Sequence, residues 1–200
     1  MKIYWTPQTR ASRLIWMAEE AGVDYEIVPI NIHDRTIKRP AEFEIASPLG
    51  KVPALSDGDV HMADSAAMCL YLADRFAPGR LAPAADATER GAFLYWLFFT
   101  PTVVEPAMSE QASGVDPNPG RNGWAQFSSM LDVWGDRLRE REWVLDSGFS
   151  AADVMLGSSA VFLRMFGLLP ESASVLSAYA DRCLARPGYA RALAGDSADS

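Results

Sequence analysis

Residues 47–55 read SPLGKVPAL, and residues 64–65 follow as DS. Pro53 comes immediately before a strand-like run, and a proline inside a central strand would remove a ladder donor. A turn that ends in a cis proline resolves this conflict and leaves the backbone N–H and C=O of Val52 unpaired. Unpaired backbone groups of this kind bind an extended peptide by adding a strand. The stretch therefore indicates a turn beside a sheet that could bind an extended peptide.

Asp64 and Ser65 stand where a helix is expected to begin. A helix N-terminus exposes N–H groups and the positive end of the dipole, and both favour a bound carboxylate. Asp64 could instead hold an ammonium group. The alternative interpretation of the same residues is a plain turn followed by an ordinary helix cap.

The sequence on both sides of this turn alternates strand and helix signals, in the order βαβ and then ββα. Pro29 predicts an edge position for the second strand. The expected elements are a strand at 2–5, a helix at 10–21 ended by Gly22, a strand at 25–30, a short helix or irregular stretch at 36–45, a hairpin at 54–62 and a helix at 65–76.

Beyond the Pro- and Gly-containing stretch 77–83, almost every signal is helical. Pro101 and Pro106 are expected to kink or end the first of these helices. The helical patterns cover 88–104, 124–141, 150–166, 172–184 and 189–193, with a loop at 113–123 and a polar tail at 195–200. The expected fold is an α/β domain over 1–78, a linker over 79–85 and an all-helical domain over 86–200.

Composition excludes several classes of function. The 200 residues carry 18 Lys and Arg against 26 Asp and Glu, a net charge of −8, with 49% hydrophobic residues. Such a chain builds a globular core, and its acidic balance argues against binding to nucleic acid or to an anionic membrane. No signal-peptide pattern or membrane-spanning run is present. The only lysines are Lys2, Lys38 and Lys51.

Cysteine and histidine usage predicts neither a disulfide framework nor a metal site. Cys69 and Cys183 are far apart in apolar, helix-like settings, which is typical of buried thiols in a reducing cytosol. His33 and His61 have no Cys or His at ligand spacing, so no zinc site is expected.

Several motifs in one order resemble the glutathione S-transferase family, in its bacterial cytosolic form. They are SPLGKVPAL at 47–55, DSAAMCLYLAD at 64–74, YWTP at 4–7, RLIW at 13–16, EEAG at 19–22, FSAAD at 149–153 and RP at 186–187. Arg10 occupies the place of the cysteine of one bacterial subclass, so the chain resembles Ser/Thr-type rather than cysteine-type members.

The resemblance implies a thioredoxin-like N-terminal domain that binds glutathione as co-substrate, and no metal. It places the cysteinyl unit of glutathione on the backbone of Val52 before Pro53. The same resemblance assigns the γ-glutamyl end to Asp64 and Ser65, and the glycyl carboxylate to Lys38 and Lys51. Three positions depart from the common family pattern: Ile37 beside Lys38, Ser47 in place of Asn, and Asp64 in place of Glu.

Thr9 is the candidate that activates the thiol, since the resemblance places Ser, Thr or Cys near this position. A hydroxyl that donates a hydrogen bond to sulfur favours the thiolate, and so does a helix dipole. Thr9 could instead only cap the helix, and Ser12 is the second candidate for activation. Tyr4 and Trp5 lie in a strand where their side chains are expected to pack.

The resemblance implies that the helix over 93–104 faces the active-site cleft, so Phe99, Thr102 and Val103, together with Gln8, are expected to line a pocket for an apolar electrophile. Ordinary core packing of its aromatic side chains is the alternative. Ser150 and Asp153 have the spacing of a capping box, which serves folding rather than catalysis.

The expected protein is a cytoplasmic, homodimeric glutathione transferase of the detoxification type. It would join glutathione thiolate to an apolar electrophile or carry out thiol or peroxide chemistry with glutathione. A non-enzymatic module of the same fold, which binds a ligand or partner without turnover, is the alternative hypothesis. Isomerase or dehalogenase activity on this fold also stays open.

Overall fold

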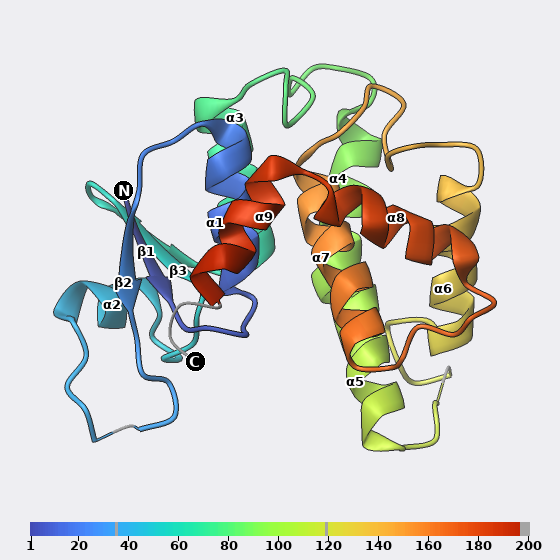
Figure 1. The fold of residues 1–200 in the computed structure, drawn as a ribbon, viewed down its shortest axis with the longest axis horizontal. Coiled ribbons are helices and arrows are strands. Elements are labelled where there is room, and N and C mark those ends of the chain that lie inside the picture. The colour runs from blue at the N-terminus through green and yellow to red at the C-terminus, as the bar shows by residue number, and fades with distance from the viewer. Residues whose placement is uncertain (35, 119, 197–200) are drawn as a thin grey trace. The chain divides into compact units, whose positions relative to one another are not determined.

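The computed structural model describes residues 1–34, 36–118 and 120–196. The contacts divide it into two compact units (Figure 1). The first contains Met1–Ala82 and the chain from Arg186 onward, and the second contains Pro83–Ala185. The expected α/β thioredoxin-like N-terminal fold followed by helices is confirmed.

The first unit is built on a mixed four-stranded sheet in the order β2-β1-β3-β4. The central β1 (Lys2–Trp5) pairs in parallel with β2 (Glu26–Pro29) and antiparallel with β3 (Ala54–Asp57). The sheet ends with β4 (Val60–Ala63), which forms the expected hairpin with β3. The edge position predicted from Pro29 in β2 is confirmed.

Helices cover both faces of this sheet. On one face, α1 (Ala11–Ala21) packs against α3 (Ser65–Phe76) and against β1. On the other face, α2 (Ala41–Ala46) inserts Phe43 into a cluster with Tyr4 of β1 and Ala54 of β3. Neighbouring residues of β1 point to opposite faces of the sheet, so β1 contributes side chains to the packing on both faces.

The last helix, α9 (Pro187–Asp196), packs on α1. Arg186 donates two hydrogen bonds of 2.7 Å to the Glu20 carboxylate, and the rings of Trp16 and Tyr189 lie 4.4 Å apart. These contacts group α9 with the first unit, which differs from the expected helical domain over 86–200. The predicted tail at 195–200 begins inside α9, and residues 197–200 lie outside the described residues.

The second unit consists of helices. They are α4 (Arg90–Phe99), the π-helix η1 (Thr100–Val104), α5 (Glu105–Ser113), α6 (Phe127–Leu138), α7 (Ala151–Met165) and α8 (Ser174–Leu184). The sequence predicted a helix over 88–104 that Pro101 and Pro106 kink or end, and in the structure the regular helix ends at Phe99 and a π turn follows from Thr100. Pro101 and Pro106 lack backbone donors, so regular i→i−4 pairing is interrupted there. Within the described ranges, no helix is long and apolar enough to cross a membrane.

The predicted capping box at the start of α7 is confirmed. Asp153 is fully buried, and its carboxylate accepts hydrogen bonds from the N–H and hydroxyl of Ser150, at 3.0 and 3.2 Å. The same carboxylate also accepts from Val144 N–H at 3.0 Å and from the Tyr179 hydroxyl at 2.9 Å. Asp153 therefore joins the start of α7 to the segment before it and to α8.

Replacing Asp153 with Ala leaves the donors of Ser150, Val144 and Tyr179 without their buried acceptor. We expect a loss of about 3 kcal/mol in unfolding free energy, from the lost cap and from the unsatisfied groups. Thermal unfolding measures it. Asp181→Ala, which removes an exposed ion pair with Arg164, is the control and should cost less than about 1 kcal/mol. Equal losses in the two variants would contradict the role of Asp153.

Burial raises the pKa of Asp153 from 3.8 to about 6. The folded state therefore binds the proton more tightly than the unfolded chain, and the stability that protonation adds is lost as pH rises through the folded pKa. We expect the unfolding free energy to fall by about 1 kcal/mol from about pH 5.5 to about pH 7.5, measured relative to Asp153→Asn. If the unfolding free energies of the two proteins changed with pH in the same way, titration of Asp153 would not be the cause.

Candidate functional site

One end of the sheet gathers the groups that the sequence singled out. Tyr4 of β1 and Ala63 of β4 are both register partners of Ala54 in β3. The chain just before β3, the chain just after β4 and the chain just after β1 therefore meet at this end. These segments are the turn that ends in Pro53, the start of α3 at Asp64, and the turn that leads into α1.

The peptide bond between Val52 and Pro53 is cis, as the sequence predicted. Val52 is half-buried, and neither its N–H nor its C=O has a backbone partner among the described residues. Pairing of β3 starts only at Ala54. The turn thus offers one donor and one acceptor to an extended ligand at the end of the sheet.

Hydrogen bonds within residues 47–51 hold the loop before Val52 in place. The Ser47 hydroxyl accepts from Lys51 N–H at 2.9 Å and donates to Lys51 C=O at 2.7 Å. Gly50 N–H donates to Ser47 C=O at 2.8 Å, and Gly50 has a left-handed φ of 65° that a glycine adopts without strain. Sequence reasoning noted Ser47 only as a departure from a family pattern and missed this pair of bonds.

Asp64 caps α3, and Ser65 is the first residue of that helix. The Oδ1 atom of Asp64 accepts from Ala66 N–H at 3.0 Å and from Ala67 N–H at 3.2 Å. Asp64 also has a φ of 77°, a conformation that is costly outside glycine and that clusters at functional sites. The capping interpretation of this pair is observed, and the exposed Asp64 carboxylate keeps Oδ2 for a ligand.

The Thr9 hydroxyl is engaged locally. It donates to Thr6 C=O at 2.7 Å and accepts from Ala11 N–H at 3.2 Å, so it holds the turn into α1. The hydroxyl of the second candidate, Ser12, donates to Thr9 C=O at 3.1 Å, and Ser12 is almost fully buried. Donation from Thr9 to a sulfur atom therefore requires its proton to leave the Thr6 carbonyl.

Lys38 and Lys51 are exposed, and neither forms an ion pair with a described residue. Sequence reasoning missed Arg39, whose guanidinium lies 5.7 Å from the centre of the Phe43 ring and close to Gly50. Lys38 and Arg39 line a hollow of about 450 Å³ between the loop before α2 and the loop after it. The signal in the sequence was the place of Arg39 directly after Lys38.

The four residues predicted to line a second pocket fall in both units. Phe99 ends α4, and Thr102 and Val103 lie on η1 directly after it. The Thr102 hydroxyl donates to Phe98 C=O at 2.7 Å, and Phe99 is 5% exposed. Gln8 lies in the turn after β1 and has a φ of 57°. The π turn thus presents Thr102 and Val103 next to the aromatic end of α4.

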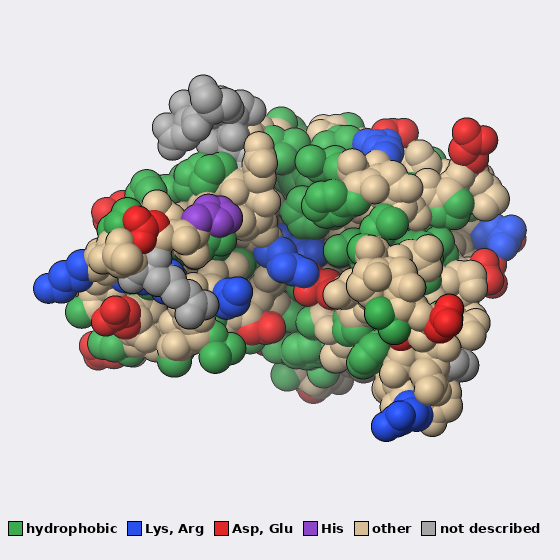
Figure 2. Space-filling model, turned by 90° about the horizontal axis from the view of Figure 1, so that it is seen from below, with side chains coloured by type: hydrophobic (Ala, Val, Ile, Leu, Met, Phe, Trp, Pro, Cys, Tyr) green, Lys and Arg blue, Asp and Glu red, His purple; other side chains and the backbone are tan. Residues whose placement is uncertain are grey.

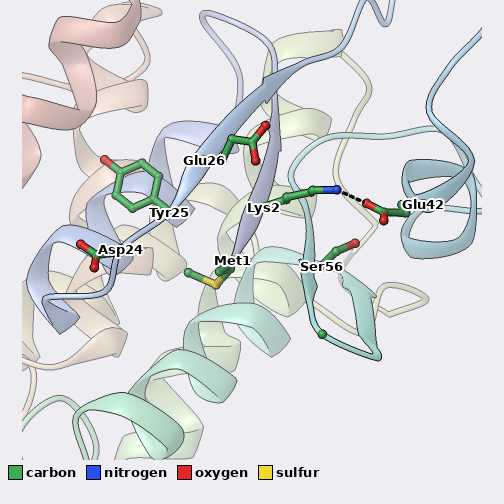
Figure 3. Close-up of a pocket in the computed structure, with 8 residues that line it drawn as sticks. Met1, Lys2, Asp24, Tyr25, Glu26, Glu42 and Ser56 are labelled. Atoms are coloured by element: carbon green, nitrogen blue, oxygen red, sulfur yellow. Dashed lines mark hydrogen bonds and ion pairs between the residues drawn. The ribbon is translucent and has the colours of Figure 1, made fainter.

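A second hollow of the first unit contains none of the predicted site residues (Figure 3). It lies at the start of β1, where Lys2 forms an ion pair of 2.6 Å with Glu42 of α2. The eight lining residues are Met1, Lys2, Asp24, Tyr25, Glu26, Glu42, Ser56 and Gly58. Lys2 is therefore engaged in an ion pair away from the hollow that Lys38 and Arg39 line.

The charged side chains are dispersed on the face drawn in Figure 2, where Lys and Arg stand beside Asp and Glu instead of forming a continuous basic surface. Both cysteines are buried and form no disulfide, and burial raises the pKa of Cys69 to about 12. Among the described residues, no group of three or more His, Cys, Asp or Glu side chains could hold a metal ion.

Known proteins resemble this chain along most of its length. The family of glutathione S-transferase N-terminal domains matches residues 9–75. Glutathione S-transferase 1 of Zea mays is 33% identical over 189 residues, which cover 90% of this chain and 86% of that protein.

Solved structures show the same fold. A sphingomonad glutathione S-transferase complexed with glutathione matches with a TM-score of 0.81 at 24% identity, covering 99% of this chain and 100% of the other. A glutathione S-transferase I bound with lactoylglutathione matches with a TM-score of 0.77 at 25% identity, covering 96% and 98%.

The fold and the cis-proline turn define a thioredoxin-like domain joined to a helical unit. The similarity to the maize protein covers nearly all of both chains. This chain belongs to the glutathione S-transferase family.

Proposed function

We propose that this family member is a glutathione transferase that joins the glutathione thiolate to an apolar electrophile, or that uses the thiolate in disulfide or peroxide chemistry. The observation that carries the proposal is the unpaired backbone of Val52 before the cis Pro53, beside the start of α3. Glutathione is an extended peptide with a thiol, and it fits a site that offers backbone pairing and opposite charges at its two ends.

Each part of glutathione has a matching group at this end of the sheet. The cysteinyl unit pairs with Val52, whose N–H and C=O have no backbone partner among the described residues. The γ-glutamyl carboxylate lies at the N-terminus of α3 near Ser65, and its ammonium faces Asp64. Lys38 and Lys51 neutralise the glycyl carboxylate. A protein with a net charge of −8 needs local cations to bind a ligand with two carboxylates and one ammonium.

The reaction needs a thiolate. A thiol with a pKa of about 8.5 is only roughly 3% ionised at pH 7, whereas a pKa of about 6.5 gives roughly 75%. The positive end of α1 favours the anion, and Thr9 precedes that helix. We assign Thr9 the role of donating a hydrogen bond from its hydroxyl to the thiolate sulfur, in place of its present bond to Thr6 C=O.

We assign the electrophile to the surface of the second unit that Phe99, Thr102 and Val103 form at the end of α4 and on η1. Its apolar character follows from Phe99 and Val103, and Thr102 adds a polar edge. The exposed Tyr95 and Phe98 side chains of α4 support a homodimer, the assembly that the family resemblance implies. We place the enzyme in the cytoplasm, where glutathione keeps buried thiols such as Cys69 reduced.

Calorimetric titration with glutathione tests the proposal, followed by turnover assays with aryl halides, epoxides, peroxides and mixed disulfides. Binding at micromolar to millimolar glutathione, with turnover of at least one class of electrophile, is the expected result. Absence of binding at millimolar glutathione would sink the proposal. Binding without turnover of any class would leave a glutathione-binding module instead of an enzyme.

The charge of Asp64 and its cap can be separated by substitution. Asp64→Asn keeps an oxygen for Ala66 and Ala67 N–H, so we expect its thermal midpoint to stay close to that of the native protein. The loss of charge facing the ammonium should raise the glutathione Kd about tenfold, as expected for a charge-assisted hydrogen bond. Asp64→Ala should lose both properties. Native affinity in Asp64→Asn, measured by calorimetry, would remove Asp64 from the binding groups.

Thr9→Val keeps the shape of the side chain and removes the hydroxyl. If Thr9 stabilises the thiolate, the pH midpoint of turnover should rise by about one unit, because the thiol pKa rises. Thr9→Ser is the control and should keep the native midpoint. An unchanged midpoint in Thr9→Val, together with a raised midpoint in Ser12→Ala, would transfer the role to Ser12.

A further inference from the structure

The hydroxyl of Ser47 satisfies both backbone polar groups of one residue. Ser47 is 2% exposed, and its Oγ atom accepts from Lys51 N–H at 2.9 Å while donating to Lys51 C=O at 2.7 Å. A hydroxyl has a single proton, so this arrangement uses it on the carbonyl and uses a lone pair on the N–H. The whole backbone of Lys51 is thereby fixed by one side chain.

The carbonyl of Lys51 belongs to the same peptide unit as the N–H of Val52. This unit is planar, and in the trans form its C=O and N–H point in opposite directions. Only the next bond, between Val52 and Pro53, is cis. Because the Lys51 carbonyl points inward to Ser47, the Val52 N–H points away from Ser47. It is therefore directed out of the loop, where it has no backbone partner among the described residues.

The remaining bonds of the loop do not use the hydroxyl. Ser47 N–H donates to Phe43 C=O at 2.8 Å, and Gly50 N–H donates to Ser47 C=O at 2.8 Å. Both are backbone bonds that survive loss of the side-chain oxygen. Lys51 itself is exposed, so water can replace the hydroxyl on its backbone. Removal of the hydroxyl thus frees one peptide unit to rotate while the turn around it persists.

We propose that Ser47 is a positioning residue for glutathione: its hydroxyl fixes the peptide between Lys51 and Val52 so that Val52 N–H faces the ligand. This rests on the proposed function, because Val52 is the group that pairs with the cysteinyl unit. A preoriented peptide lowers the ordering cost of binding, so Ser47 acts on affinity for glutathione and leaves the thiol chemistry at Thr9 untouched.

Calorimetry with glutathione on the native protein, Ser47→Ala and Ser56→Ala tests this role. Ser56 is a matched control, since it is 6% exposed and its hydroxyl also has two partners, Tyr4 at 3.1 Å and His61 at 2.8 Å. We expect Ser47→Ala to raise the glutathione Kd about tenfold, the effect of one well-aligned hydrogen bond. In Ser56→Ala the Kd should stay within about twofold of native, while the thermal midpoint falls.

A second pair of variants separates the hydroxyl from the space it fills. Thr and Val at position 47 have the same shape and differ in one hydroxyl, so both carry the same added methyl group. Ser47→Thr should bind glutathione severalfold more tightly than Ser47→Val. This comparison decides the proposal even if Ser47→Ala fails to fold. In turnover assays, Ser47→Ala should raise KM for glutathione and leave kcat at saturation within about twofold.

Three results would overturn the role of Ser47: a native Kd in Ser47→Ala, equal Kd values for the Thr and Val variants, or an equal weakening in Ser56→Ala. Each presupposes that the native protein binds glutathione. If the native protein shows no binding at millimolar glutathione, the proposed function fails first and the role of Ser47 fails with it. The native titration therefore distinguishes the two failures.

Discussion

The register of the central strands is the constraint on which the rest of the site depends. Ala54 faces Tyr4 on one side and Ala63 on the other, so three chain segments are obliged to leave the sheet at one end. A shift of β3 by one residue would move Val52 and Pro53 away from Asp64 and turn every β3 side chain to the opposite face. The core of Tyr4, Phe43 and Ala54 opposes that shift, because a shift by one residue would turn the Ala54 side chain out of the cluster. Packing beneath the sheet thus fixes the geometry of binding groups at its end.

The first unit belongs to an acidic protein and yet needs positive charge beside the proposed glutathione site. The net charge of −8 disfavours anions, yet glutathione, the ligand that we propose for the Val52 turn, is itself anionic. Lys38 and Lys51 face no acidic partner in the described part of the chain, whereas Lys2 is held by Glu42 at the far end of β1. An acidic protein can therefore bind a small anion if a few cations stay unpaired beside one backbone turn. The same balance disfavours long polyanions, which need a continuous basic surface.

Local patterns in the sequence predicted most of the fold. The strand and helix order of the first unit, the edge position of Pro29 and the cap at Ser150 all follow from residues close in sequence. The packing of α9 on α1 was missed, because the pairing of Arg186 with Glu20 depends on the tertiary fold. The π-helix was missed as well, since two prolines indicate a break without saying which turn replaces it.

The candidate site was less predictable than the fold. Sequence motifs pointed to Val52, Pro53 and Asp64. The pairing of Ala54 with Ala63 brings these residues to the same end of the sheet. Which acceptor a hydroxyl donates to depends on distances in the folded chain. The sequence therefore could not show that the Thr9 hydroxyl donates to Thr6 C=O, or that the Ser47 hydroxyl bonds to the backbone of Lys51. Arg39 was overlooked for a related reason, because its closeness to Gly50 exists only in the folded loop.

The return of α9 to the α/β unit has a consequence for synthesis on the ribosome. The second unit, Pro83–Ala185, is continuous in sequence and is complete before the last helix has been made. The first unit lacks the partner of α1 until the chain beyond Arg186 has emerged. Domains usually fold in N-to-C order during synthesis, but here the N-terminal unit is completed after the C-terminal one. The α/β unit is completed last, although its sheet is synthesised first.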